Sequence, residues 1–392
     1  MTDAKTILSA GIDAYASGDY KTARVKLNEV LNQVPDDFEA LTFLARVDDA
    51  TGFLDKAVQG YEKALLIKPS HETVHVLLAQ SLLAIGDFER GFDEYQWRLT
   101  KPDGTSLLPD FRIPQWRGEN LKAKTLFVMA DQGFGDSIQF VRYVPLLAKM
   151  GAAVMMAVGP ELGRLFKTVD GITRFSTGPK DPHNLTADYF TVLSSLPYLM
   201  KTTLETVPMD VPYVHANPKQ VKRWQRRFDK MTGIKVGLIW AGRKDHPNDH
   251  SRSLSVKDLM PFKNAKARFV ALQKGGDQGA MKNVCDVCGF VDVTALIQDF
   301  SDTAAVMENL DLIITVDTAA AHLAGALGKP VWLLLPNVPE WRWMRDRIDS
   351  PWYPTFRLFS QSANDGWAPV INAIKQELDG YSVAGYSAGT GW

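Results

Sequence analysis

The fold is decided by one stretch of the chain, Ile313 to Leu335, which reads IITVDTAAAHLAGALGKPVWLLL. Its apolar, β-rich start predicts a buried strand that ends at Val316. Small residues then predict a short helix to Leu327, and a Gly-Lys-Pro turn leads into a second apolar strand that begins at Val331. A strand, a helix and a strand in this order predict an open α/β sheet, which binds ligands beyond the carboxyl ends of its strands.

The start of this helix predicts an anion site. Asp317 and Thr318 are good N-caps, and the residues that follow, to Ala321, carry no side chain large enough to keep an anion from the backbone amides. A diphosphate is the natural ligand of such a helix start. His322 is expected to point from the first turn toward the same mouth, although a lone histidine is more often structural than catalytic. The alternative is an ordinary capped turn between a strand and a helix.

The sequence VDTAAAHLAGALGKPVW, residues 316–332, resembles the nucleotide-sugar site of the heptosyltransferase-like glycosyltransferases. The resemblance implies the GT-B fold, in which two Rossmann-like domains face each other and the carboxyl-terminal one holds the donor. It also implies that the donor contacts Asp317, Thr318, Ala319, Ala320 and His322.

Length and composition exclude several classes of protein. The chain of 392 residues is long enough for two or three domains, and its 45% hydrophobic and 23% charged residues are ordinary for a globular protein. The net charge is −1 with both signs interspersed, so no nucleic acid is expected as a partner. The first residues lack a basic segment followed by an apolar one, and no apolar run has the length of a membrane span. We therefore expect a cytoplasmic protein without a membrane span.

The sequence predicts no metal and no cofactor. The two cysteines, Cys285 and Cys288, form one C-x-x-C, which is half of a zinc site and does not open a thioredoxin-like unit. The chain also contains no D-x-D triplet. Metal-dependent glycosyltransferases commonly hold Mg²⁺ or Mn²⁺ with such a pair, whereas cationic side chains and helix amides can carry a leaving diphosphate without metal.

The first hundred residues repeat. Gly18, Gly52 and Gly86 recur at intervals of 34 residues, and each lies in a similar turn. The period, a small residue five positions after each glycine and the prolines that end the first two units resemble the tetratricopeptide repeat. Each unit would be a helical hairpin that buries its large residues by stacking on its neighbour. About three repeats are expected, and they either bind a peptide in a groove or serve as a structural and dimerising support.

The predicted fold class is therefore α/β with an all-α N-terminal part. Between the repeats and the α/β part, Phe111, Ile113 and Trp116 are too apolar for a free linker and should pack at a domain junction. The expected parts are tetratricopeptide repeats (1–100), a packed connector (101–120), an N-terminal Rossmann-like acceptor domain (121–215), a C-terminal Rossmann-like nucleotide-sugar domain (216–380) and a disordered Gly- and Ser-rich tail (381–392).

The segment after the connector predicts a strand, a tight loop and a helix. Thr125 to Ala130 is apolar, the loop holds Gly133 and Gly135, and Asp136 opens the helix. A third glycine is absent, so an ordinary NAD fingerprint is not supported. The loop resembles the Gly-Asp turn of the heptosyltransferase-like enzymes, in which the aspartate faces the acceptor. The resemblance implies that Asp136 is the catalytic base and that both glycines line the site; a plain N-cap carboxylate is the alternative.

In the second half, cations follow the carboxyl ends of predicted strands. The polar loop after the strand Val236 to Trp240 carries Arg252. In the resembled enzymes a cationic side chain of this loop binds the donor diphosphate, and Arg252 is its best positional match. Arg243 and Lys244 are close competitors in the same loop.

The next strand ends at Gln273 and Lys274, which are expected to contact the nucleotide, with Lys274 as a second phosphate ligand. Asp277 is a candidate for the ribose hydroxyls. Further along, Asp302-Thr303 is expected to cap a helix that runs to about Asn309.

Three other segments invite an interpretation. The basic helix Lys219 to Met231 is expected to present a solvated face, with a functional anion site as the alternative. The last helix, Trp367 to Leu378, is expected to return toward the first Rossmann-like domain. A third segment holds an unusual density of aromatic and cationic residues, which predicts either a core between domains or a cleft wall that stacks on sugar or base. Its members are Trp341, Trp343, Trp352, Arg342, Arg345 and Arg347.

Taken together, the chain resembles bacterial tetratricopeptide-repeat proteins fused to a heptosyltransferase-like domain. The resemblance implies a metal-independent, inverting glycosyltransferase that moves a sugar from a nucleoside-diphosphate sugar to a hydroxyl of a protein or glycan acceptor, which the repeats would dock. A nucleotide-sugar epimerase and a catalytically inactive nucleotide-binding interaction protein are the alternatives. The oligomeric state is left open, with a homo-oligomer among the options.

Overall fold

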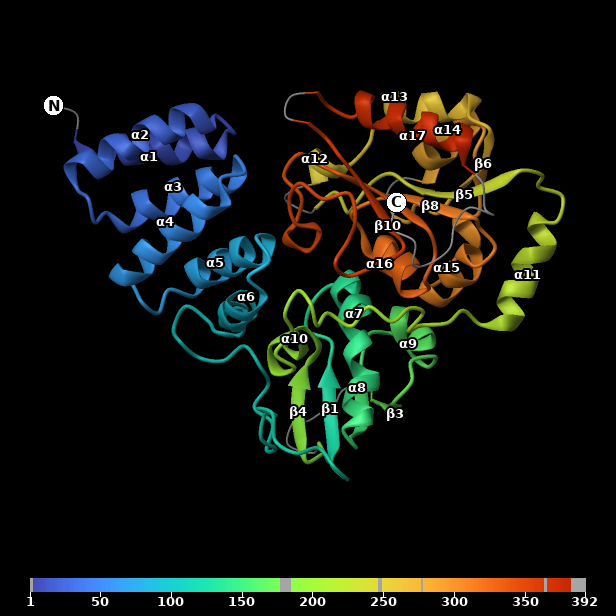
Figure 1. Cartoon of the computed structure of the whole chain (residues 1–392), viewed down its shortest axis with the longest axis horizontal. Helices are drawn as coiled ribbons and strands as arrows, with labels where there is room; N and C mark the ends of the chain where they lie inside the picture. The colour runs from blue at the N-terminus through green and yellow to red at the C-terminus, as the bar shows by residue number, and fades with distance from the viewer. Residues whose placement is uncertain (1–2, 177–184, 246–248, 276–277, 363–364, 382–392) are drawn as a thin grey trace. The chain divides into compact units, whose positions relative to one another are not determined.

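The computed structural model (Figure 1) describes residues 3–176, 185–245, 249–275, 278–362 and 365–381. It divides into two compact units, and each is described by itself. The first unit comprises residues 1–110, 197–207 and 338–346, and the second comprises residues 111–196, 208–337 and 347–392.

The first unit contains the three predicted helical hairpins. Each hairpin turns at a glycine with positive φ, +80° at Gly18, +85° at Gly52 and +89° at Gly86, and only glycine adopts such a conformation at no steric cost. The small residues five positions later are buried where the two helices touch. The helices are α1 (Ala4–Ala16), α2 (Tyr20–Gln33), α3 (Phe38–Ala50), α4 (Leu54–Ile67), α5 (Glu72–Ala84) and α6 (Phe88–Glu94), followed by the 3₁₀ helix η1 (Tyr95–Leu99).

A segment from far along the sequence packs with these repeats. The 3₁₀ helix η7 (Trp341–Trp343) lies on it, and the Trp341 ring meets the Phe92 ring edge-on with centroids 5.9 Å apart. Arg345 Nη2 donates to the Asp49 carbonyl at 3.4 Å, and burial raises the pKa of the Asp49 carboxyl. Residues 338–346 therefore belong to the core of the repeat unit.

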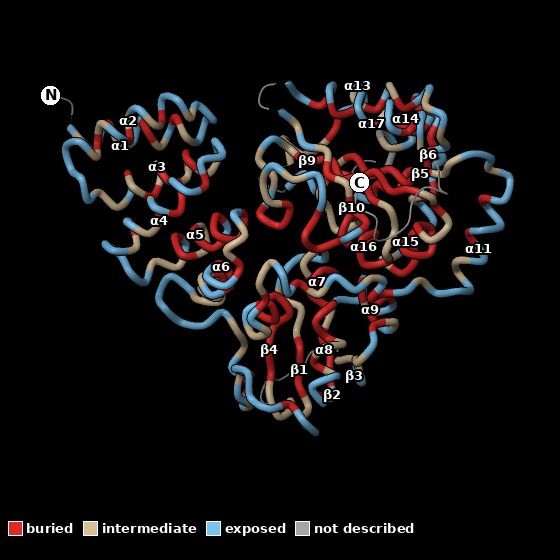
Figure 2. The backbone as a smooth tube through the Cα atoms, in the orientation of Figure 1, coloured by how far each residue is buried: buried red, intermediate tan, exposed pale blue. Residues whose placement is uncertain are grey.

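The second unit holds two parallel sheets. The first has the order β3-β2-β1-β4, so β1 lies inside the sheet and β4 at one edge, and most residues of both strands are buried (Figure 2). The connector packs on this sheet, since the Phe111 ring meets those of Phe127 and Phe190 at 5.8 and 4.7 Å. The elements are β1 (Thr125–Met129), α7 (Phe134–Phe140), η2 (Val141–Tyr143), α8 (Val144–Lys149), β2 (Ala153–Ala157), α9 (Pro160–Phe166), β3 (Ile172–Ser176), β4 (Tyr189–Val192) and η4 (Leu193–Ser195). The helix that follows, α10 (Leu196–Leu199), belongs to the first unit from residue 197 on.

The second sheet has the order β10-β9-β8-β5-β6-β7, and all of its strands are parallel. Counted within this domain, the order is that of a Rossmann fold, and the order reverses between β5 and β8. The predicted fold class is confirmed. The elements are α11 (Pro218–Phe228), β5 (Ile234–Ile239), α12 (Asp249–Arg252), α13 (Val256–Leu259), η5 (Met260–Asn264), β6 (Ala267–Ala271), α14 (Gln278–Cys288), β7 (Val291–Asp292), η6 (Thr294–Leu296), α15 (Phe300–Met307), β8 (Leu312–Val316), α16 (Ala319–Ala326), β9 (Val331–Leu335), β10 (Phe356–Ser360) and α17 (Ala368–Gly380).

The deciding stretch folds as predicted. It forms β8, α16 and β9, and every residue of the two strands is buried. Continuous apolar strands of this kind are expected where helices cover both faces of a parallel sheet.

Two expectations about helices are wrong. Helix α15 is capped by Asp299, whose side chain accepts from the Asp302 amide, so the cap lies three residues before the predicted Asp302-Thr303. Helix α17 does not return to the first Rossmann-like domain: its Ile371, Ile374 and Leu378 are part of the core of the second sheet. The predicted tail falls almost wholly on residues 382–392, outside the described part of the chain.

Within the described residues, no helix combines the length and the apolar character needed to cross a membrane.

Candidate functional site

A cavity of about 520 Å³ lies at the carboxyl ends of β5, β6 and β8, where the strand order of the second sheet reverses. This is where open α/β sheets bind ligands, and the volume suits a small organic molecule. The first Rossmann-like domain contributes Gly133, Phe134 and Glu161 to its lining. The second contributes Ile239, Ala241, Gly242, Arg243, Arg252, Leu272, Gln273, Lys274, Gly275, Ile297, Gln298, Asp299, Phe300, Thr303, Thr318, Ala319 and Ala320.

The start of α16 forms one wall of the cavity. Thr318 is the N-cap, with extended backbone and no capping hydrogen bond from its side chain, and Ala319 and Ala320 follow it along the wall. Asp317 does not line the cavity; its carbonyl oxygen instead accepts a hydrogen bond from Arg252. The first residues of the helix thus lie beside an open space. The amide of Ala321, which the sequence also offered to an anion, donates instead to the Thr318 carbonyl at 3.0 Å.

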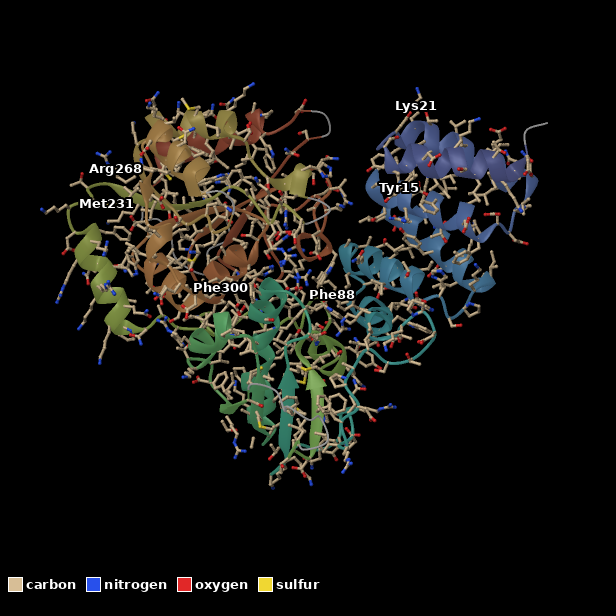
Figure 3. The ribbon with its side chains drawn as sticks, turned by 180° about the vertical axis from the view of Figure 1, so that it is seen from behind. Tyr15, Lys21, Phe88, Met231, Arg268 and Phe300 are labelled. Carbon is tan, nitrogen blue, oxygen red and sulfur yellow. The ribbon has the colours of Figure 1, made fainter. Side chains whose placement is uncertain are left out.

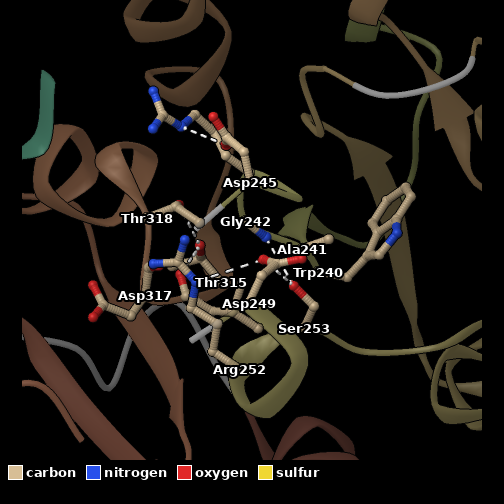
Figure 4. Close-up of polar contacts among 12 residues, drawn as sticks. Trp240, Ala241, Gly242, Asp245, Asp249, Arg252, Ser253, Thr315, Asp317 and Thr318 are labelled. Atoms are coloured by element: carbon tan, nitrogen blue, oxygen red, sulfur yellow. Dashed lines mark hydrogen bonds and ion pairs between the residues drawn. The ribbon is translucent and has the colours of Figure 1, made fainter. Parts of the chain in front are cut away.

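Arg252 is the cation that the fold fixes in this wall. Its Nη1 donates to the Asp317 carbonyl at 2.9 Å, its Nε lies 3.6 Å from Asp249 Oδ1, and its side chain is only 14% exposed (Figure 4). Gly242 makes this position possible, because a Cβ there would lie 2.7 Å from the guanidinium carbon. The guanidinium is therefore held where α16 begins.

A relay of hydrogen bonds holds the loop that carries Arg252. The Gly242 amide donates to Ser253 Oγ at 3.0 Å, and the Ser253 hydroxyl donates to Asp249 Oδ1 at 2.8 Å (Figure 4). The same carboxylate faces Arg252. The relay ties the end of β5 to the short helix α12.

The two competing cations of this loop are less constrained. Arg243 lines the cavity, but its side chain is 80% exposed and its Nε pairs with Asp245 at 3.2 Å. Lys244 is exposed and does not line the cavity. Asp277 lies outside the described residues.

Gln273 and Lys274 both line the cavity, and both also bind backbone. Gln273 Oε1 accepts from the amides of Trp240 and Ala241 at 3.1 and 2.9 Å, and its Nε2 donates to the Ala241 carbonyl at 2.9 Å. Gln273 thus positions the end of β5. Lys274 Nζ donates to two carbonyls of the segment after β7, at 2.8 Å to Ile297 and at 3.1 Å to Thr294.

On the first domain, α7 begins directly after Gly133. Asp136 lies in the first turn of α7 and is half-buried. Of the described residues that line the cavity, Gly133 and Phe134 belong to this turn, whereas Asp136 is not one of them. The predicted base, Asp136, therefore lies two residues after a residue of the cavity wall, Phe134, but is not itself part of the wall.

The structure places His322 between helices, not at the cavity mouth. The imidazole is 5% exposed, and its Nδ1 lies 2.9 Å from Tyr353 Oη. A Cβ at Gly135 would lie 2.9 Å from the imidazole Cδ2, so Gly135 lets α7 approach α16 closely. Burial holds the pKa of Tyr353 well above its ordinary value, so the hydroxyl stays protonated beside the imidazole.

The sequence did not reveal two groups on the cavity wall. Glu161 lies in the first turn of α9, and Phe134 meets Phe300 edge-on with centroids 5.2 Å apart, so that one ring from each domain closes this part of the cavity. Glu161 follows the carboxyl end of β2, and that position was the one signal that could have found it.

A salt bridge joins the two domains beside these rings. Arg164 Nη1 lies 3.1 Å from Asp299 Oδ2, and Arg164 Nη2 lies 3.3 Å from Asp302 Oδ1. Arg164 is on α9 and both carboxylates are at the start of α15. Asp299 is thus engaged by a cation, although it lines the cavity.

The dense aromatic and cationic segment is not part of the cavity wall. Trp341, Trp343 and Trp352 are buried, and none of them lines the cavity. Trp341 and Trp343 pack in the first unit, with the repeats. Trp352 belongs to the second unit, where the centroid of its ring lies 6.1 Å from that of Phe140 of the same unit. The stacking-wall interpretation is therefore wrong for these three rings.

The two cysteines lie on α14 in the core of the second sheet. Burial, with a smaller contribution from Asp292, raises the pKa of the Cys285 thiol to about 11. Among the described residues, no group of three or more His, Cys, Asp or Glu side chains could hold a metal ion.

Comparison with known proteins gives distant likenesses. No family model matches the chain. The chain is 25% identical over 400 residues to Protein FlbA of Caulobacter vibrioides, and the alignment covers 94% of this chain but only 65% of the length of FlbA.

Two solved structures show how distant the likenesses in fold are. The glycosyl transferase family 9 from Veillonella parvula matches 63% of this chain and 88% of its own, with 12% identity and a TM-score of 0.47. The Sgt2 TPR domain from Aspergillus fumigatus matches 25% of this chain and 66% of its own, with 20% identity and a TM-score of 0.24. Scores at this level decide neither activity nor ligand.

Proposed function

We propose that the chain is a glycosyltransferase that moves a sugar from a nucleoside-diphosphate sugar to a hydroxyl acceptor. One observation carries the proposal: the guanidinium of Arg252 and the first amides of α16 meet on one wall of a cavity at the strand-order reversal of a Rossmann-like sheet. The sequence of that wall is also the one that resembles the nucleotide-sugar site of the heptosyltransferase-like enzymes.

The wall suits a diphosphate for two physical reasons. The unpaired amides at the start of a helix attract an anion, and the helix dipole adds to this attraction. A guanidinium binds phosphate with two donors in a fixed plane. Charge grows on the diphosphate as its bond to the sugar breaks, so cations held in place beforehand stabilise the transition state. In this proposal Arg252 and Lys274 supply that charge, and no metal is needed.

The acceptor side supplies the base. In the proposed inverting reaction, a carboxylate takes the proton of the acceptor hydroxyl, whose oxygen attacks the anomeric carbon as the opposite carbon–oxygen bond breaks and the diphosphate leaves. Asp136 is the base that the resemblance implies. Glu161 is its competitor, because it is a carboxylate of the first domain that lines the cavity. The repeats would dock the protein or glycan acceptor.

The proposal is tested with a panel of UDP-, GDP-, ADP- and TDP-sugars. Each is incubated with the full chain, with and without cell lysate as a source of acceptor, and the released nucleoside diphosphate is measured. We expect one donor to give release that depends on the lysate and that is lost in Arg252→Ala.

The two candidate bases are separated by Asp136→Asn and Glu161→Gln in the same assay. Loss of the general base lowers turnover by about 10² to 10⁴-fold. The true base will show this loss, whereas the other variant will keep most of its activity. Release of an altered nucleotide sugar without any acceptor would identify an epimerase, and nucleotide binding without turnover would identify an inactive binding protein.

A further inference from the structure

Helix α11 carries a stripe of cations along one face. Six lysines and arginines follow one another at steps of three and one residues, which keeps them on one side of a helix. All six are exposed, and Figure 3 shows nitrogen-tipped side chains that project outward from this helix. The basic stripe consists of Lys219, Lys222, Arg223, Arg226, Arg227 and, in the turn that follows the helix, Lys230.

The opposite face of α11 fixes the direction in which the stripe points. Trp224 and Phe228 are buried and stack with ring centroids 5.7 Å apart. Asn309 Nδ2 donates to the Val221 carbonyl at 3.1 Å, and the Gln220 side chain bonds to Asp302. The apolar face therefore packs on α15, and the stripe is held outward by the fold.

The stripe is not neutralised by its surroundings. None of its six cations forms an ion pair with another residue in the part of the chain that the structure describes, and Asp229 is the one acid between Lys219 and Lys230. Other exposed arginines do pair, such as Arg90 with Glu62. The concentration of charge is also local, since the whole chain has a net charge of −1.

We propose that the basic stripe docks the chain on the anionic headgroups of a lipid bilayer. The stripe is about 16 Å long at 1.5 Å per residue, and its six exposed side chains lie on one side of the helix, where a flat surface can meet them all. The stripe offers charge alone, because the two aromatic residues of α11, Trp224 and Phe228, are buried on the opposite face. It therefore has no exposed ring on which the bases of a single-stranded nucleic acid could stack, and no apolar centre of the kind found in protein interfaces. Anionic headgroups require only charge, and each lysine or arginine near them adds to binding.

This inference does not depend on the proposed function, because the stripe lies outside the cavity and none of its residues lines it. It would bring α11 and the domain that carries it to a membrane surface. Binding of this purely electrostatic kind is reversible and weakens as salt rises.

The test is sedimentation of the full chain with vesicles, either of neutral phosphatidylcholine or with roughly one third phosphatidylglycerol, at low and at physiological salt. The test variant is Lys222→Gln with Arg226→Gln. The matched control is Lys149→Gln with Arg112→Gln, which removes the same charge from two exposed residues outside the stripe. A short duplex DNA and a single-stranded RNA serve as competing polyanions.

We expect binding to the anionic vesicles alone, with a partition coefficient about fivefold lower for each charge removed, or roughly 30-fold lower in the test variant. The control should bind like the unmodified chain. An equal loss in both variants, no binding at low salt, or stripe-dependent binding to nucleic acid without binding to vesicles would overturn the proposal.

Discussion

Two glycines act through the space that they leave: Gly242 in the cavity wall, and Gly135, which was expected to line the site but is not part of the wall. Gly242 gives its space to the Arg252 guanidinium, and Gly135 gives its space to the His322 imidazole. In neither case does the backbone require glycine, since neither residue has a positive φ. The absence of a side chain at each glycine thus leaves room for a larger neighbour. At Gly242 that neighbour is Arg252, the proposed phosphate ligand.

Gly242→Ala tests this use of space. The added Cβ would lie 2.7 Å from the guanidinium carbon, so Arg252 must leave its place beside α16. We expect the affinity for nucleoside diphosphate to fall about tenfold or more, as for the loss of a charged hydrogen bond. Gly163→Ala is the control, because nothing lies within 4 Å of its added Cβ. Unchanged affinity in Gly242→Ala would show that Arg252 does not act from the observed position.

At the scale of elements, α14 explains why the C-x-x-C is not a reactive pair. Cys285 and Cys288 lie one helical turn apart on its buried face. The pKa of Cys285 rises from 9.0 to about 11, so little thiolate is present near neutral pH, and the thiolate is the reactive form. Because the folded state keeps this proton while the unfolded state releases it above about pH 9, the group lowers stability as the pH rises from 9 toward 11.

Thiol labelling checks this account. In the Cys288→Ser variant, we expect the folded chain to react with iodoacetamide roughly 100-fold more slowly than an exposed thiol at pH 8, in line with a raised pKa, and to react fully in urea. The comparison is a Lys149→Cys variant that lacks both native cysteines, since Lys149 is exposed. Equal rates in the two folded variants would contradict the buried position of Cys285.

Elements with a strong local pattern could be predicted, and those that depend on distant partners could not. The 34-residue spacing of the turn glycines and the apolar runs of β8 and β9 predicted their structures because the signal lies within each element. The position of α17 depends on which sheet face is uncovered, so its sequence alone gave the wrong neighbour. The short helix α12, which holds Arg252 in place, has too few residues for a periodic pattern.

The same limit applies to the site. Lys274 and the start of α16 became candidates because they follow strand ends, and Arg252 became one through the resemblance; all three line the cavity. Glu161 also follows a strand end, but its strand carried no motif that drew attention to it. The burial of His322 could not be predicted, because it depends on Tyr353 and on a close approach of two helices.

At the scale of the whole molecule, Arg142 joins segments that are distant in sequence. Its side chain is buried, and its three nitrogens donate to the carbonyls of Gln139, Pro208 and Trp352 at 2.8, 3.0 and 2.7 Å and to Tyr213 Oη at 3.0 Å. One guanidinium thus ties η2 of the first Rossmann-like domain to residues 208–213, which lead into the second domain, and to the segment before β10.

Arg142→Lys and Arg142→Met both test this junction. Lysine cannot reproduce the planar set of donors, and methionine leaves buried carbonyls without partners. We expect each variant to lose about 3 kcal/mol of unfolding free energy in urea titrations, with the exposed Arg112→Lys as a neutral control. A loss below about 0.5 kcal/mol in both variants would show that other contacts hold the junction.

The central claim is that a nucleoside diphosphate binds at the wall formed by Arg252 and the start of α16. Calorimetric titration of UDP, GDP, ADP and TDP into the full chain tests it most directly, with Arg252→Ala beside the unmodified protein. The account predicts that one of the four binds and that Arg252→Ala weakens its affinity about tenfold or more. Binding of none of them, or equal affinity in both proteins, would contradict it.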